Sequence, residues 1–185
     1  MSSDGRRAVS PAPGGLSLVQ ALVNTSPIAA AGLPDRLDDE MSAQQWLDES
    51  LRAWSEQTGQ EPPALVVGPR DLAPLRSLRD DVRGWITGGG AGHALAAEIS
   101  ISAGRPTYRP SKNGAAGLAS LVTLEALLAA HTGTLARLKT CQNPDCAAAF
   151  YDRSRNSTRV WHDMKTCGNQ LNLRASRARR RTPTT

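Results

Sequence analysis

Three cysteines and one histidine near the C-terminus have the residue types and the spacing of a metal site. Cys141, Cys146, His162 and Cys167 form the pattern C-x4-C-x15-H-x4-C. The NPD segment between the first two cysteines is rich in turn formers, so both sulfurs should face one point. Zinc binds thiolate and imidazole in a tetrahedron, about 2.3 Å from sulfur and about 2.0 Å from nitrogen. We therefore predict one zinc ion held by these four side chains.

The cysteine count and placement support this interpretation over three unrelated free thiols. An odd number of cysteines cannot pair fully within one chain, and a reducing compartment would keep all three as thiols. All three lie after residue 140, whereas cysteines used as small apolar filler would be scattered. Four protein ligands leave no open position for water or substrate, so the predicted zinc is structural.

The segment around the predicted ligands is expected to be a small domain built on the metal. AAAFYD and TRVW are predicted as two short strands joined by a loop at 153–157, and a helix after His162 should carry Cys167 in its first turn. Phe150 and Trp161 are predicted to pack beneath the metal, with base stacking as the alternative. This order of elements predicts a treble-clef-like finger.

Charge is divided unequally along the chain. Residues 137–185 contain eleven Lys or Arg against three Asp, whereas residues 1–136 are mildly acidic. A basic segment attached to an acidic body is typical of a protein that meets a polyanion. Arginine can bind phosphates or read guanine edges, and the predicted helix and loop supply the candidate contacts. These are Arg153, Arg155 and Arg159 in the loop, and Gln170, Arg174, Arg177 and Arg181 on one helix face.

The preceding residues, 16–136, are predicted to be mainly helical. Apolar spacing indicates a buried segment over 16–25 and helices over 42–58, 71–87 and 115–130. Ser42 is the expected N-cap of the second of these segments, and Asp38 to Glu40 are expected to be a solvated loop. In the last helix, Leu118, Leu121, Val122, Leu124 and Leu128 are expected to face inward.

The rest of the body is predicted to contain a β-hairpin and flexible segments. AEISISAGRPTYRP alternates around Ala103-Gly104 as a hairpin does, and GGGAG at 88–92 is a connector without the Gly-Lys-Ser/Thr of a phosphate loop. Residues 1–15 are expected to be disordered. The predicted fold class is therefore mainly α with a small β-hairpin (α+β), followed by the finger.

No catalytic set or membrane segment is predicted. His93 and His131 each lie alone among apolar or small residues, and lone histidines are usually structural or solvated. No acid, base and nucleophile come together in the pattern, so we do not expect an enzyme. No stretch approaches 18 consecutive apolar residues and no apolar signal region follows the N-terminal arginines, which predicts a cytoplasmic protein.

Several of these residues resemble a known family. The NPDC turn, the F-x-D motif at 150–152, Ser154, Arg159, Trp161 and Cys167-Gly168-Asn169 are similar to the CGNR zinc finger proteins of bacteria. In that family the finger follows a mainly helical domain called ABATE, described as a putative stress-induced transcription regulator. ALVNT at 21–25 resembles the N-terminal signature of that domain. The chain departs from the family at His162, where a cysteine is usual, and at Gln170, where an arginine is usual.

The resemblance implies four segments and a DNA-binding regulator. The segments are the N-terminal 1–15, an ABATE-like domain at 16–136, the finger with its basic helix at 137–181, and a tail at 182–185. The finger is expected to bind DNA, and the body to sense a signal or form a homodimer. The alternatives are an RNA- or ribosome-associated binder, a redox switch that releases zinc when its thiolates are oxidised, and a module whose arginines meet an acidic protein.

Overall fold

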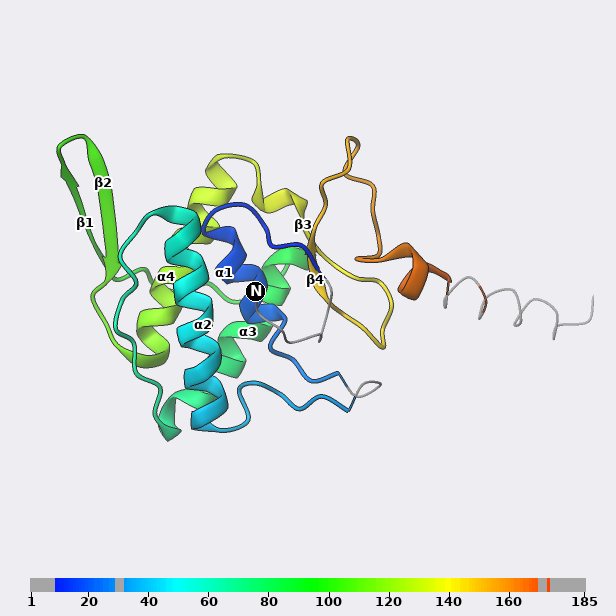
Figure 1. Ribbon diagram of the computed structural model, residues 1–185, viewed down its shortest axis with the longest axis horizontal. Coiled ribbons are helices and arrows are strands. Elements are labelled where there is room, and N and C mark those ends of the chain that lie inside the picture. Colours follow the sequence, from blue (N-terminus) through cyan, green and yellow to red (C-terminus); the bar gives the residue numbers. More distant parts are fainter. Residues whose placement is uncertain (1–8, 29–31, 170–172, 174–185) are drawn as a thin grey trace, which may run out of the picture.

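Four α-helices and two small antiparallel hairpins are the main elements of the part of the chain that the structure describes (Figure 1). The structure is a computed structural model, and it describes residues 9–28, 32–169 and 173. The α+β fold class predicted from the sequence is confirmed. The helices are α1 Leu16–Val23, α2 Glu40–Thr58, α3 Leu72–Thr87 and α4 Gly114–His131, and the strands are β1 Ala97–Ser102, β2 Arg105–Pro110, β3 Leu138–Thr140 and β4 Ala149–Tyr151.

Helix α1 lies at the centre of the core and contacts the other three helices. Six of its eight residues are buried, because it is apolar on nearly every side. The predicted apolar stripe of α2 is confirmed, since Trp46, Leu47, Leu51 and Trp54 are all buried. The stripe of α3 is also confirmed, with its central leucines and Val82 fully buried.

The start of α2 differs from the sequence prediction. The N-cap is Asp39, whose carboxylate accepts hydrogen bonds from Ser42 N (2.9 Å) and Ser42 Oγ (2.8 Å). The prediction of Ser42 as N-cap was therefore wrong. Asp38 and Asp39 are exposed and precede the helix, as expected for a solvated loop, whereas Glu40 is the first residue of α2. A carboxylate three residues before a free helical N–H caps that N–H as well as a hydroxyl does. Its negative charge also interacts favourably with the positive end of the helix dipole.

Helix α4 has the length and the mean hydropathy of a membrane-spanning segment, but 61% of it is buried inside the fold. Leu118, Leu121, Val122 and Leu124 face the core as predicted. The prediction for Leu128 was wrong, because its side chain is 43% exposed. Beyond Ala126, Ala129 is the one residue of α4 that still reaches the core, so the last turn extends past the packed surface.

The β1–β2 hairpin is confirmed, and it projects from the body at the end opposite the finger (Figure 1). Its turn is Ala103-Gly104, and both residues have positive φ (49° and 76°), as a two-residue turn of this twist requires. Tyr108 anchors the base of the hairpin in the core. Its ring lies edge-on to Trp54, with centroids 6.0 Å apart, and its hydroxyl donates to Glu125 Oε1 at 2.6 Å.

Residues 9–15 are packed against the fold, in contrast to the disorder expected from their composition. Ala12 is buried, and its N–H donates to Gln20 Oε1 at 2.6 Å. Pro11 O accepts a hydrogen bond from Arg153 Nη2 at 2.8 Å. These contacts satisfy backbone groups that a Pro/Gly/Ala-rich segment cannot satisfy within itself. Residues 1–8 lie outside the described residues.

Candidate metal centre

The Cys141–Cys146 turn folds as predicted. Asn143 is almost fully buried at its centre, and its carbonyl accepts from Cys146 N (2.9 Å) and Ala147 N (3.0 Å). Its side-chain oxygen accepts from Asp145 N at 3.1 Å, which closes an Asx turn. Cys141 N donates to Ala148 O at 2.8 Å, so the two arms of the turn are bonded to each other. Both sulfurs are thereby brought to one side.

The hairpin beneath this turn is made of different strands from those predicted. β4 (Ala149–Tyr151) pairs with β3 (Leu138–Thr140), which precedes Cys141, and not with TRVW. The cysteine turn itself is the connection, since it returns the chain directly alongside the residues before it. Residues 158–161 form no strand and contact the turn through the Gln142 N to Val160 O hydrogen bond at 3.0 Å.

The second pair of candidate ligands lies around a short helical turn, Met164–Gly168. His162 precedes this turn, and Cys167 lies within it, as predicted. Asp163 caps this turn, and its carboxylate accepts from Thr166 N at 2.9 Å. The turn is of the wide π type, and Asp163 O accepts from both Cys167 N and Gly168 N. A Cβ at Gly168 would lie 2.4 Å from Met164 Sδ and 3.2 Å from the Trp161 ring, so a larger residue at this position of the CGN triplet would require the Met164 side chain to move.

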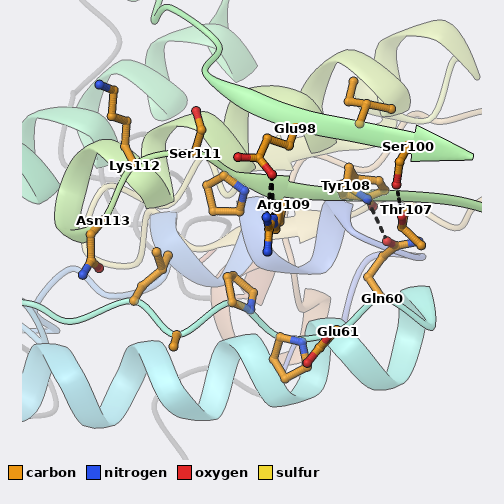
Figure 2. Close-up of a pocket in the computed structure, with 16 residues that line it drawn as sticks. Gln60, Glu61, Glu98, Ser100, Thr107, Tyr108, Arg109, Ser111, Lys112 and Asn113 are labelled. Atoms are coloured by element: carbon orange, nitrogen blue, oxygen red, sulfur yellow. Dashed lines mark hydrogen bonds and ion pairs between the residues drawn. The ribbon is translucent and has the colours of Figure 1, made fainter.

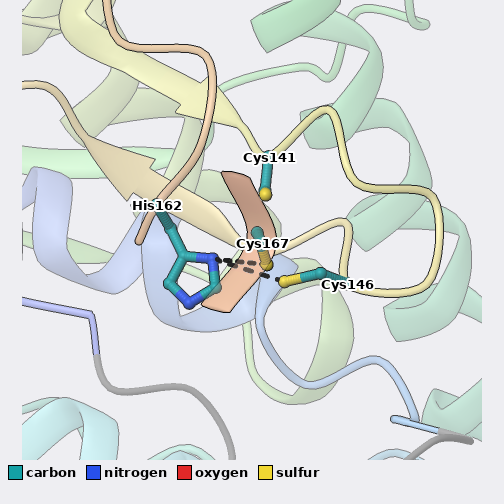
Figure 3. A group of neighbouring side chains, drawn as sticks. All are labelled: Cys141, Cys146, His162 and Cys167. Atoms are coloured by element: carbon teal, nitrogen blue, oxygen red, sulfur yellow. Dashed lines mark hydrogen bonds between the residues drawn. The ribbon is translucent and has the colours of Figure 1, made fainter. Parts of the chain in front are cut away.

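Figure 3 shows the four predicted ligands converging on one point from these two turns. One donor atom from each of Cys141, Cys146, His162 and Cys167 lies within 4.8 Å of every other. His162 Nδ1 is 3.4 Å from Cys146 Sγ and 3.6 Å from Cys167 Sγ. A tetrahedral zinc ion would place sulfur and nitrogen ligands about 3.6 Å apart. The geometry therefore matches a four-coordinate ion with Nδ1 as the histidine donor.

The electrostatics of the cluster also fit a cation. Burial, together with the neighbouring Cys141 and Cys167 sulfurs, raises the pKa of the Cys146 thiol to about 12. Three thiolates cannot share such a site without a compensating charge. A divalent cation reverses this effect, because a coordinating thiol is deprotonated by the ion. These four donors thus form one potential metal site.

The cluster has an apolar floor, as predicted. Phe150 is 3% exposed and packs with the two buried cysteines and Ala148, and Val9 and Trp161 pack against them. Phe150 is therefore a core residue and is not available for base stacking. The four ligands and this floor make up the core of the finger.

A residue that sequence reasoning did not assign, Asp152, organises the rest of the finger. Its side chain is fully buried and accepts from Lys139 Nζ (2.8 Å), from Ser154 N and Oγ, and from Arg159 N. Burial alone would raise its pKa, but these hydrogen bonds hold the pKa well below the usual value. The F-x-D motif was the available signal, because it contains Asp152.

The loop after Asp152 contains the three predicted nucleic-acid contacts that the structure describes. All three arginines are exposed, but two of them also make contacts within the protein. Arg153 donates to Pro11 O and lies over the Tyr151 ring. Arg159 donates to His162 O and lies over the Phe150 ring. Arg155 lies at the loop tip between them. The remaining predicted contacts, Gln170, Arg174, Arg177 and Arg181, lie outside the described residues.

The two isolated histidines do not contribute to this centre. His93 Nε2 lies 2.9 Å from Asp81 Oδ2 and its ring packs edge-on to Trp85, whereas His131 is exposed in the last turn of α4. Within the described ranges, the Cys/His cluster is the group of side chains that could hold a metal ion.

The fold and the site together define a zinc-finger domain with a potential metal site, attached to a helical body. Comparison with known families agrees, because residues 137–180 match the model of the CGNR zinc finger. No curated protein matches the chain. The family match begins at the last residue before β3, so the similarity of residues 16–136 to the ABATE domain stays a prediction.

Proposed function

We propose that the metal is zinc and that its role is structural. The donor set of three cysteines and one histidine is a zinc set, and all four tetrahedral positions are taken by protein atoms. No position remains at which an ion could activate water, so we propose no catalytic role for the centre. The zinc would hold the cysteine turn, the helical turn and the arginine loop in one arrangement.

The finger, in this proposal, binds duplex DNA, and the protein is a cytoplasmic transcription regulator of the ABATE and CGNR type. The observation that carries the proposal is the exposure of Arg153, Arg155 and Arg159 on a loop held by the metal cluster and Asp152. Five further arginines follow residue 173 in the sequence. Such a surface neutralises phosphates, and arginine forks can also read guanine.

The same surface could meet the phosphates of structured RNA, which makes RNA the second candidate. Aromatic residues make up 4% of the chain, and Phe150 is committed to the finger core. Recognition of single strands by base stacking is therefore disfavoured relative to recognition of a duplex. The helical body would serve as the sensing or oligomerising part in either case.

A salt series on the full metal-loaded chain tests the proposal. Binding to duplex DNA, to a structured RNA and to an acidic polypeptide is measured by gel shift or anisotropy over a range of salt concentrations. We expect DNA to bind with a slope of log K against log[salt] of about −0.9 for each phosphate neutralised. Chelated protein is the control and should bind more weakly. Tighter binding to RNA than to DNA would identify RNA as the ligand of the finger. Binding to the acidic polypeptide alone would overturn the proposal of nucleic-acid recognition.

A further inference from the structure

The projecting β1–β2 hairpin has one face that is apolar and largely uncovered. Ile99 pairs with Tyr108 and Ile101 pairs with Pro106, so these four side chains share one face. Tyr108 fixes the base of this face in the core, but Ile99 and Ile101 are 62% and 75% exposed. A two-stranded hairpin is marginally stable by itself, so two exposed isoleucines on it are an unusual feature.

The two outer edges of the hairpin differ in what covers them. In a hairpin with a two-residue turn, the pairs Ser102–Arg105 and Ser100–Thr107 are hydrogen-bonded, and the alternate residues point their backbone groups outward. On β2 those outward positions are Pro106, Tyr108 and Pro110. The prolines have no N–H to offer. Figure 2 shows the Gln60 side chain at Tyr108, where its Oε1 accepts from Tyr108 N at 3.1 Å.

The β2 edge is therefore protected. Gln60 Nε2 also donates to Pro106 O at 3.1 Å, so one side chain satisfies two of the outward backbone groups on this edge. Residues 60–65, which include Pro62 and Pro63, line a groove together with residues 98–100 of β1 and 107–110 of β2 (Figure 2). Proline and a covering segment are the usual means by which proteins prevent strand pairing at an edge.

The β1 edge has none of these protections. Its outward-pointing backbone groups belong to Ala97, Ile99 and Ile101, none of which is proline. Within residues 9–28, 32–169 and 173, nothing is hydrogen-bonded to the outer edge of Ile99 or Ile101. Figure 1 shows β1 on the side of the hairpin that faces away from the helices. This edge presents backbone donors and acceptors ready to pair with another strand.

We propose that the occupant of this edge is β1 of a second copy of the chain. Two β1 strands can pair antiparallel about a two-fold axis at Ser100, which makes a four-stranded sheet from two hairpins. In this register Ile99 lies opposite the partner's Ile101, and both residues have outward backbone groups, as a hydrogen-bonded pair requires. The two-fold axis is perpendicular to the sheet, so all four isoleucines lie on the same face.

The charges of β1 are compatible with the same register. Glu98 is the one charged residue of the strand, and it would lie opposite the partner's Ser102. Its carboxylate is already bonded to Arg109 of its own hairpin, with Nη2 at 2.6 Å, so no like charges are brought together. The sequence is thus self-complementary in both the apolar and the charged positions, which is what a two-fold symmetric interface requires.

The inference does not rest on nucleic-acid binding, since the hairpin and the finger lie at opposite ends of the molecule (Figure 1). Its first test uses a cysteine on the two-fold axis. Ser100→Cys would face its own copy in a non-hydrogen-bonded pair, with Cα atoms about 4.5 Å apart, a spacing that a disulfide can bridge. Ser102→Cys is the matched control, because it lies on the same face and strand but opposite the partner's Glu98.

The expected result, in the full metal-loaded chain under mild oxidation, is a disulfide-linked dimer of Ser100→Cys on a non-reducing gel and little from Ser102→Cys. Equal crosslinking of both variants would overturn the register.

In a second measurement, sedimentation velocity should show concentration-dependent dimers, and Ile101→Lys should weaken the dimer by about tenfold or more. Val66→Lys, at a 64% exposed apolar residue outside the hairpin, should leave the dimer unchanged. A wild-type chain that stays monomeric at every concentration would overturn the proposal, and binding of an extended peptide by that monomer would assign the edge to another protein.

Discussion

His162 can replace a cysteine because its near ring nitrogen is the one that faces the sulfurs. Nδ1 is two bonds beyond Cβ, so its reach is closer to that of a thiolate than the reach of Nε2 would be. The Nδ1 distances of 3.4 and 3.6 Å to two sulfurs leave room for an ion without movement of the backbone. A neutral imidazole also lowers the negative charge of the centre by one relative to four thiolates.

We therefore expect His162→Cys to keep metal binding and His162→Ala to weaken it by at least about tenfold, since even outer-shell changes at metal sites cost that much. Competition against a chromophoric chelator measures the affinity. His131→Ala, which removes an exposed imidazole from α4, is the control. Asp163 could take over only if it left its capping bond to Thr166 N. Unchanged affinity in His162→Ala would show that His162 is not a ligand.

Asp152 predicts a stability effect with a defined pH dependence. Asp152→Asn leaves Lys139 without its carboxylate and weakens the bonds to Ser154 and Arg159, so it should destabilise the finger by about 1–3 kcal/mol near pH 7. Because the folded pKa is lowered, the contribution is fully present above the unfolded pKa of about 3.9 and is lost as pH falls toward the folded pKa.

Denaturant unfolding of wild type and Asp152→Asn over a pH series checks this prediction. The difference in unfolding free energy should be constant from neutral pH down to about pH 5 and should shrink below about pH 4. The exposed Asp38→Asn should show no such difference. A difference that grows as the solution becomes more acidic would contradict the assigned role.

At the scale of elements, periodic apolar patterns predicted the helices well, but tertiary contacts decided the rest. The stripes of α2 and α3 could be predicted because burial follows the helical period. The pairing of β4 with β3 could not, since a three-residue strand has no pattern that distinguishes one partner from another. The ordered packing of residues 9–15 could not be predicted either, because it depends on single hydrogen bonds to Gln20 and Arg153.

The metal ligands were predictable because their residue types and spacing carry the chemistry directly. The network of Asp152 was not, since the F-x-D motif points to the residue but does not identify the donors that surround it. The β1 edge was likewise invisible in the sequence, where AEISIS resembles any half-buried strand. Its exposure follows from where the hairpin meets the core, at Tyr108 and Trp54.

The hairpin β3–β4 should depend less on the metal than the turns on either side of the ligands. Asn24, the C-cap residue of α1, binds both backbone groups of Ala149, with Ala149 N to Oδ1 at 2.9 Å and Nδ2 to Ala149 O at 3.0 Å. Gln20 Nε2 adds a bond to the same carbonyl at 3.2 Å. The body thus holds the first part of the finger through one side chain of its central helix and one at the C-cap of that helix.

Hydrogen exchange with and without chelator measures this dependence. We expect chelation to increase exchange in residues 141–148 and 152–169, while Leu138–Thr140 and Ala149–Tyr151 stay protected. In Asn24→Ala, which removes both amide bonds to Ala149, β4 should lose protection once the metal is removed. Equal loss of protection in β4 and in the turns of the chelated wild type would show that the metal, and not α1, holds the hairpin.

At the scale of the whole molecule, the body links two surfaces of different character. The finger with its arginine loop lies at one end and the β1 edge at the other (Figure 1). A dimer formed through β1 would carry its two fingers far apart. The two fingers of such a dimer would not contact the same phosphates. The proposed DNA contacts can therefore be tested for each finger independently.

The predicted basic helix provides that test. Arg174 and Arg177 lie outside the described residues, and their assignment as DNA contacts is a prediction from helical spacing. Replacing both with Ala should weaken binding and flatten the slope of log K against log[salt] by roughly two units if both touch phosphate. If one reads a guanine instead, the loss should be about 1–3 kcal/mol and concentrated on the preferred sequence. Metal content should not change, because neither residue is a ligand.

The control is the double variant Arg52→Ala and Arg70→Ala, which removes two exposed charges from the body and should leave the slope nearly unchanged. Gln170→Arg, which restores the residue usual in the CGNR family, should bind equally or more tightly. An unchanged slope in the Arg174 and Arg177 variant, with DNA binding intact, would move the interface to the loop at 153–159. Equal flattening by both double variants would instead show that net charge, and no particular surface, governs the binding.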